Sequence, residues 1–108
     1  MAIAAARRLT ARGVRAFARD EVKRAAQALE AAVGYDPDLI WPRWNLARLY
    51  LKQECRLDAL AQYEALQTNL PDGLRPAFER EMNAVTGRSG SAESFGVPLA
   101  DWGERVSE

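Results

Sequence analysis

The sequence contains no histidine and only one cysteine, Cys55, among its 108 residues. A single cysteine forms no disulfide within the chain, and the usual nitrogen and sulfur ligands of a structural zinc site are missing. Without histidine, the Cys55 thiol also lacks the base that commonly activates a nucleophile. We therefore expect no metal, cofactor or small-molecule substrate, and no enzymatic activity. The lone thiol is typical of a reducing compartment.

Long apolar runs are also missing, because no stretch approaches the roughly 20 residues that a membrane-spanning helix requires. The first residues, MAIAAARRLTARG, place arginines after a very short apolar patch, which is the wrong order for a secretory signal. We therefore expect a cytoplasmic protein without a membrane span. Arginine outnumbers lysine 13 to 2 and alanine is abundant, which favours a bacterial source with a GC-rich genome.

The charges are unevenly distributed, although 15 basic and 15 acidic residues balance. Residues 1–24 contain seven basic and two acidic residues, whereas residues 25–86 contain six basic and nine acidic residues. A solvated face is the first interpretation of this basic end, and an acidic protein partner is the alternative. Nucleic acid and membrane surfaces are disfavoured, because interleaved aromatic and bulky apolar residues are missing. The basic ridge consists of Arg8, Arg12, Arg15, Arg19 and Lys23.

Apolar residues at spacings of three and four predict five helices and an all-α fold. The helices are expected at about 3–19, 20–33, 42–53, 57–66 and 74–86, with Gly34 ending the second. In the fifth helix, Phe78 and Met82 are expected on the apolar face, and Glu79 and Glu81 in solvent.

Several residue types recur after 34 positions. Pro37 is matched by Pro71, and further pairs are Ala25 with Ala59 and Pro42 with Pro76. A fixed period of this length is typical of repeat architectures, in which each unit buries its apolar face against its neighbours.

Residues 6–86 resemble the tetratricopeptide repeat family over about two and a half repeats. Small residues stand at the expected helix crossings, at Gly13 and Ala47, and the closing prolines are Pro37 and Pro71. The family's large residue in the second helix is matched by Leu29 and Tyr63. Three positions depart from the pattern: Arg12 replaces a large apolar residue, Leu66 an alanine and Glu54 the glycine of the inner turn. The resemblance implies an α-solenoid of antiparallel helix pairs over residues 1–86.

In that family the first helices of successive pairs line a concave groove that holds a protein segment. Two tryptophans on this face, which we expect to be exposed, are the most informative feature, because tryptophan and arginine are enriched in binding hot spots. The alternative is that one or both tryptophans pack against the next repeat or under the tail. The resemblance places Thr10, Val14 and Phe17 of the first helix beside these residues. The predicted partner-binding residues are Trp41, Trp44, Asn45, Arg48, Leu51, Lys52, Arg75, Phe78 and Met82.

Residues 87–108 begin as a Gly-Ser-rich linker and are predicted to form a flexible tail with a short docking helix. The tail residues predicted to dock are Phe95, Leu99 and Trp102. The leading functional hypothesis is a non-enzymatic interaction module, a small scaffold, adaptor or accessory subunit that binds a protein partner or another copy of the chain. In a second hypothesis the tail occupies the groove until a partner displaces it. A nucleic-acid role for the basic end is a less favoured alternative.

Overall fold

The computed structural model describes residues 2–87, and all regular elements in this range are helical, as predicted. The tail residues Phe95, Leu99 and Trp102 lie outside the described residues. The elements are α1 (Ala2–Ala18), α2 (Val22–Tyr35), α3 (Ile40–Lys52), α4 (Arg56–Gln67), the 3-10 helix η1 (Asp72–Leu74) and α5 (Arg75–Thr86).

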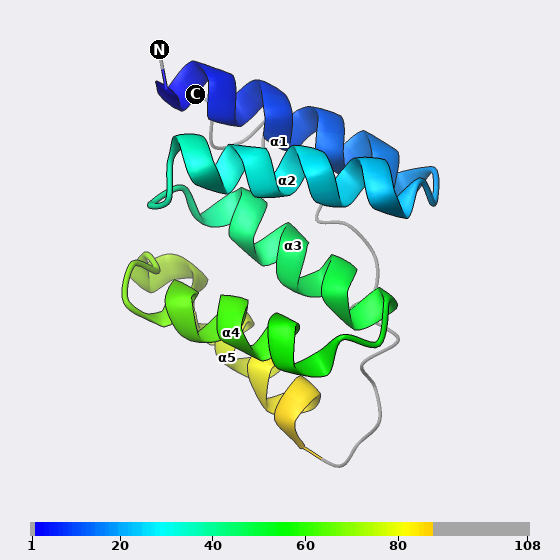
Figure 1. The fold of residues 1–108 in the computed structure, drawn as a ribbon. Coiled ribbons are helices and arrows are strands. Elements are labelled where there is room, and N and C mark those ends of the chain that lie inside the picture. The colour runs from blue at the N-terminus through cyan, green and yellow to red at the C-terminus, as the bar shows by residue number, and fades with distance from the viewer. Residues whose placement is uncertain (1, 88–108) are drawn as a thin grey trace.

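Neighbouring helices in the chain are also neighbours in space (Figure 1). Helices α1 and α2 form one antiparallel pair, α3 and α4 form a second pair, and α2 packs against α3 to join the two pairs. Helix α1 also contacts α3, so the first helices of the two pairs lie close together. The helix α5 follows the second pair and packs its apolar side chains against α3 and α4.

The turns within the two pairs have the same conformation at positions 34 residues apart. Asp20 and Glu54 both have positive φ, at 64° and 63°. In each turn the following residue donates a backbone hydrogen bond to a carbonyl five residues earlier, which is the pattern of a left-handed helix C-cap. These bonds run from Glu21 to Ala16 (2.9 Å) and from Cys55 to Tyr50 (2.8 Å). The sequence period therefore corresponds to a repeated backbone geometry.

Small residues permit the close approach of α1 and α2. A Cβ atom added at Gly13 would lie 2.7 Å from Cγ and 2.8 Å from Cδ2 of Leu29. Real Cβ atoms do not approach other carbons this closely, so the helices pack at this distance only because Gly13 has no side chain. Ala25, Ala47 and Ala59 are each 0% exposed. The predicted small-residue positions thus lie in the helix interfaces.

The end of α2 differs from the prediction. Gly34 lies inside the helix, which continues to Tyr35. A glycine near the end of a helix costs only about 1 kcal/mol, which the surrounding packing offsets. The helix ends instead at Asp36, whose backbone is extended at φ −146° and ψ 89°. The cause is Pro37, because a residue that precedes proline is disfavoured in helical conformation.

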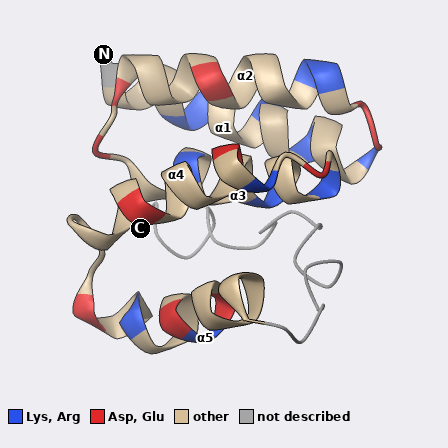
Figure 2. Ribbon diagram, turned by 60° about the horizontal axis from the view of Figure 1, so that its bottom comes forward, with Lys and Arg blue, Asp and Glu red and all other residues tan. Residues whose placement is uncertain are grey.

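Apolar side chains gather in two clusters that meet at α3. One joins α1, α2 and α3 and contains Ala16, Phe17, Ala25, Leu29, Leu46 and Leu49. The other joins α3, α4 and α5 and contains Trp41, Trp44, Ala47, Ala59, Tyr63, Leu66, Leu70, Phe78 and Val85. Helix α3 is therefore apolar over most of its circumference and forms the centre of the fold. Helix α1, at the edge, carries basic but no acidic residues (Figure 2).

Candidate functional site

The residues predicted to bind a partner on α3 do share one face of that helix. At about 100° per residue, the six positions fall within a sector of about 120°. We call this sector the α3 contact face; it comprises Trp41, Trp44, Asn45, Arg48, Leu51 and Lys52. Phe78 and Met82 of α5 belong to the same apolar cluster as its two tryptophans. The structure therefore brings most of the predicted set together.

The two tryptophans are buried, so the expectation that they are exposed is wrong. Trp41 is 7% exposed and Trp44 3% exposed. Their rings stack with centroids 5.8 Å apart and planes 3° from parallel. The ring of Phe78 meets Trp44 edge-on at 5.6 Å. Packing against the next repeat was the alternative interpretation of the sequence. The contact between Trp44 and Phe78 of α5 fits that alternative. Burial leaves the partner-binding role of both residues a prediction.

Further residues of the predicted groove are buried as well. Asn45 is 0% exposed, and its side-chain amide donates a 3.0 Å hydrogen bond to the carbonyl of Trp41. Phe78 is 0% exposed. On α1, Thr10, Val14 and Phe17 are 0%, 8% and 3% exposed. The expected open groove lining is therefore largely interior.

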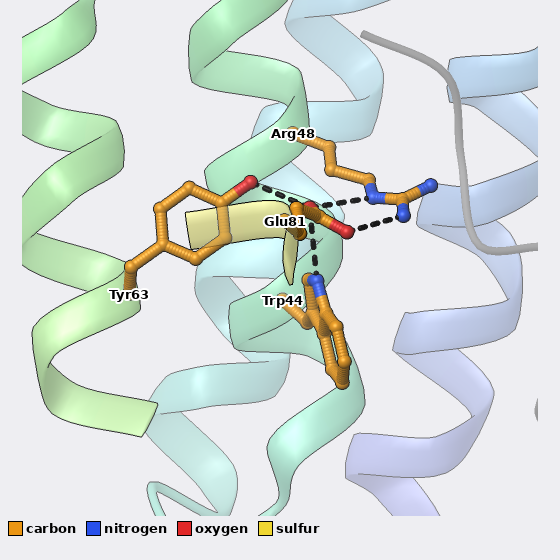
Figure 3. Close-up of polar contacts among 4 residues, drawn as sticks. All are labelled: Trp44, Arg48, Tyr63 and Glu81. Carbon is orange, nitrogen blue, oxygen red and sulfur yellow. Dashed lines mark hydrogen bonds and ion pairs between the residues drawn. The ribbon is translucent and has the colours of Figure 1, made fainter. Parts of the chain in front are cut away.

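Behind the indoles lies a carboxylate that the sequence analysis placed in solvent. Glu81 of α5 is 3% exposed and accepts hydrogen bonds from three side chains of α3 and α4 (Figure 3). Its Oε2 accepts from Trp44 Nε1 at 3.0 Å, Arg48 Nε at 2.9 Å and the Tyr63 hydroxyl at 2.6 Å, and its Oε1 accepts from Arg48 Nη2 at 2.5 Å. We call these four residues the Glu81 cluster.

The position of Glu81 follows from the spacing of its neighbours. Phe78 lies three residues before it and Val85 four residues after it, and both are buried. Residues at these spacings share one face of a helix, so packing of the two apolar residues also turns Glu81 inward. This spacing was the available sequence signal, but it competed with the strong tendency of glutamate to lie at the surface.

The Glu81 cluster is suited to hold three helices together. The buried carboxylate receives the bidentate Arg48 guanidinium and two neutral donors, which offsets part of the cost of removing its charge from water. Burial, followed by the charge and hydrogen bond of Glu81, raises the pKa of the Tyr63 phenol far above its usual value. The tyrosine therefore stays a donor across the physiological range. Because its hydrogen bonds join α3, α4 and α5, we interpret the cluster as structural.

The remaining predicted residues are partly accessible and lie at different places. The Lys52 ammonium is 3.1 Å from a carboxylate oxygen of Asp20, and its side chain is 39% exposed. Arg75 is half-buried and donates to the carbonyls of Gln67 and Leu70 at 3.3 and 3.4 Å. Leu51 and Met82 are half-buried against the second apolar cluster. Of the accessible part of the predicted set, only Leu51 and Met82 therefore lie against the cluster that contains the indoles.

Within residues 2–87, no group of three or more histidine, cysteine, aspartate or glutamate side chains is placed to hold a metal ion. In the same range, no helix combines the length and apolar character needed to cross a bilayer. Cys55 is exposed at the turn before α4. Comparison with models of known protein families, with curated proteins and with solved structures found no match.

Proposed function

We propose that the chain is a non-enzymatic protein–protein interaction module of the tetratricopeptide-repeat type. It would serve as a small scaffold, adaptor or accessory subunit. The observation that carries this proposal is the repeated turn geometry at Asp20 and Glu54, combined with a close-packed helix pair at Gly13 and Leu29. The step from such a fold to partner binding is an analogy, because helical repeats gain function from their surfaces and not from chemistry at one site.

The proposed contact surface lies around the α3 contact face and its neighbour α5. Its accessible side chains are Leu51 and Met82, which pack against the apolar cluster of Trp41 and Trp44, and Lys52, which is 39% exposed. A protein segment fits this mixed surface, because half-buried apolar groups at the centre of an interface contribute desolvation and polar groups at its margin fix orientation.

Photo-crosslinking from defined positions tests this assignment. A photoreactive phenylalanine derivative replaces either Leu51 on the α3 contact face or Glu64, an exposed residue of α4 that serves as the matched control. In the native host, we expect the Leu51 variant to form a crosslink to one discrete protein. We expect the Glu64 variant to form none. Crosslinking from Glu64 alone, or from neither position in cells that contain the chain at its normal level, would contradict the proposal.

A second candidate is the self-regulated module. It is favoured by the apolar residues Phe95, Leu99 and Trp102 in the sequence of the tail. Deletion of residues 88–108 should then increase the crosslinking yield from Leu51 severalfold. An unchanged yield from a deletion variant with normal helix content would remove this candidate.

In a homo-oligomer, a second copy of the chain would cover the proposed contact surface around the α3 contact face. Light scattering tests it directly, because the single chain has a mass of 12.0 kDa. A concentration-dependent mass of twice this value would make a second copy the partner. A constant monomer mass would leave a different protein as the partner.

A further inference from the structure

Three exposed arginines of α1, and a fourth in the turn directly after it, form a continuous stripe. Arg8, Arg12, Arg15 and Arg19 are all exposed and follow spacings of four, three and four residues. At about 100° and 1.5 Å per residue, they fall within a sector of about 60° and extend over about 16 Å. The buried residues of α1 lie on the opposite side, against α2 and α3. We call this feature the arginine stripe.

The arginine stripe has no acidic partner within the described part of the chain. Helix α1 contains no aspartate or glutamate. The three ion pairs found within residues 2–87 join Arg24 to Glu21, Arg48 to Glu81 and Lys52 to Asp20. Four positive charges therefore face solvent side by side.

The repeat relates this stripe to a helix interface elsewhere in the molecule. The residues 34 positions after Arg12 and Arg15 are Leu46 and Leu49 of α3. These leucines are 2% and 0% exposed and belong to the cluster that packs α3 against the preceding helix α2. The arginine stripe on α1 thus corresponds to the face of α3 that packs against α2. A helix docked on the stripe would pack against α1 in the way that α2 packs against α3.

A polar face would suit the edge of a helix array, but polarity alone does not explain why every charge on this face is positive. Like charges four residues apart, as at Arg8 and Arg12 or Arg15 and Arg19, destabilise a helix. A mixture of lysine and glutamate would keep the end soluble without this cost. The excess of arginine is better explained by a ligand with opposite charge.

We propose that the arginine stripe docks an acidic helix of another protein, whose carboxylates repeat at spacings of three and four residues. Guanidinium groups bind carboxylates in a bidentate manner, and both helices would present charges at the same intervals. A second copy of this chain is a poor candidate for the acidic helix, because no helix within residues 2–87 carries more than two exposed carboxylates. Nucleic acid also fits poorly, since the exposed residues beside the stripe include Ala4, Ala11 and Ala18 and offer no ring for base stacking. This surface is separate from the α3 contact face, so the two proposals stand independently.

Two helical peptides with the same composition provide the test. One carries four glutamates at spacings of four, three and four on a single face, and the other carries them on different faces. Affinity for the full chain is measured by fluorescence anisotropy at about 50 mM and about 200 mM salt, because exposed ion pairs are screened by salt. We expect the single-face peptide to bind more tightly, and more salt to weaken its binding.

Matched variants locate the contact. Arg12→Gln/Arg15→Gln removes two charges from the arginine stripe, and Arg24→Gln/Arg80→Gln removes two exposed charges from α2 and α5. At the usual strength of surface ion pairs, the first variant should weaken binding about tenfold, while the second changes it by less than about twofold. Circular dichroism confirms that both variants stay folded.

Three results would overturn the proposal. The first is equal affinity for the two peptides, or no measurable binding of either at the lower salt concentration. The second is tighter binding of a duplex or single-stranded oligonucleotide, or of anionic lipid vesicles, than of the single-face peptide. The third is self-association of the chain that is lost in Arg12→Gln/Arg15→Gln, which would make a second copy the occupant of the stripe.

Discussion

Replacement of Glu81 by glutamine removes a negative charge from the interior while keeping the size of the side chain. The carboxylate of Glu81 accepts hydrogen bonds from Trp44, Arg48 and Tyr63. In Glu81→Gln the amide oxygen can still accept, but the new NH2 group is a donor that faces other donors. Arg48 keeps its charge and loses its counter-ion at this site.

The expected cost follows from the burial of the pair. Loss of one partner of a buried ion pair destabilises a protein by about 3–5 kcal/mol. The Arg48 side chain is 12% exposed and Glu81 3% exposed, so the arginine keeps some access to water. We therefore expect the lower end, about 3 kcal/mol, from a total that is about 5–15 kcal/mol in domains of this kind. The matched control is Glu79→Gln, an exposed position on the same helix, which should change stability by less than about 0.5 kcal/mol.

Urea unfolding followed by far-ultraviolet circular dichroism measures both variants. With a slope of about 1.5 kcal/mol per molar urea, the midpoint of Glu81→Gln should fall by about 2 M. Tyr63→Phe should cost about 1.5 kcal/mol alone and less when combined with Glu81→Gln, because both changes remove the same hydrogen bond. A Glu81→Gln midpoint equal to that of Glu79→Gln would refute the buried ion pair.

Three further predictions concern the packing, the turns and the tyrosine. Gly13→Ala should destabilise by about 1–2 kcal/mol because its Cβ meets Leu29, whereas Gly34→Ala, with open space around it, should stabilise by about 0.5–1 kcal/mol in thermal unfolding. Glu54→Gly should raise the free energy of unfolding by up to about 1 kcal/mol, because glycine adopts positive φ without strain; a lower value would contradict the turn geometry. Because its folded-state pKa is raised, Tyr63 contributes stability that is complete below about pH 10 and lost above it. Tyr63→Phe should therefore lose less stability between about pH 9 and pH 11 than the unchanged chain.

The helices and their pairing were accessible to sequence reasoning because their determinants are local or strictly periodic. Apolar residues at helical spacing defined the five helices, and the small residue at Gly13 marked the close approach to Leu29. The end of α2 was displaced by two residues because the influence of Pro37 on Asp36 outweighed the helix-ending tendency of Gly34.

The environment of the indoles was not accessible in the same way. Tryptophan is enriched both in binding hot spots and in interiors, so the pattern on α3 fits either role. The choice depends on α5, whose Phe78 covers Trp44 from a position 34 residues away. Glu81 was assigned to solvent because its partners Arg48 and Tyr63 come from two other helices, and no local pattern joins them.

Nuclear Overhauser contacts in solution test the central claim, that the two helix pairs share a 34-residue repeat and that α5 covers Trp44. We predict contacts between Gly13 and the methyl groups of Leu29, and between the rings of Trp44 and Phe78. The indole N–H of Trp44, bound to Glu81, should also be protected from exchange with water. An unprotected indole N–H together with missing contacts between Trp44 and Phe78 would contradict the account.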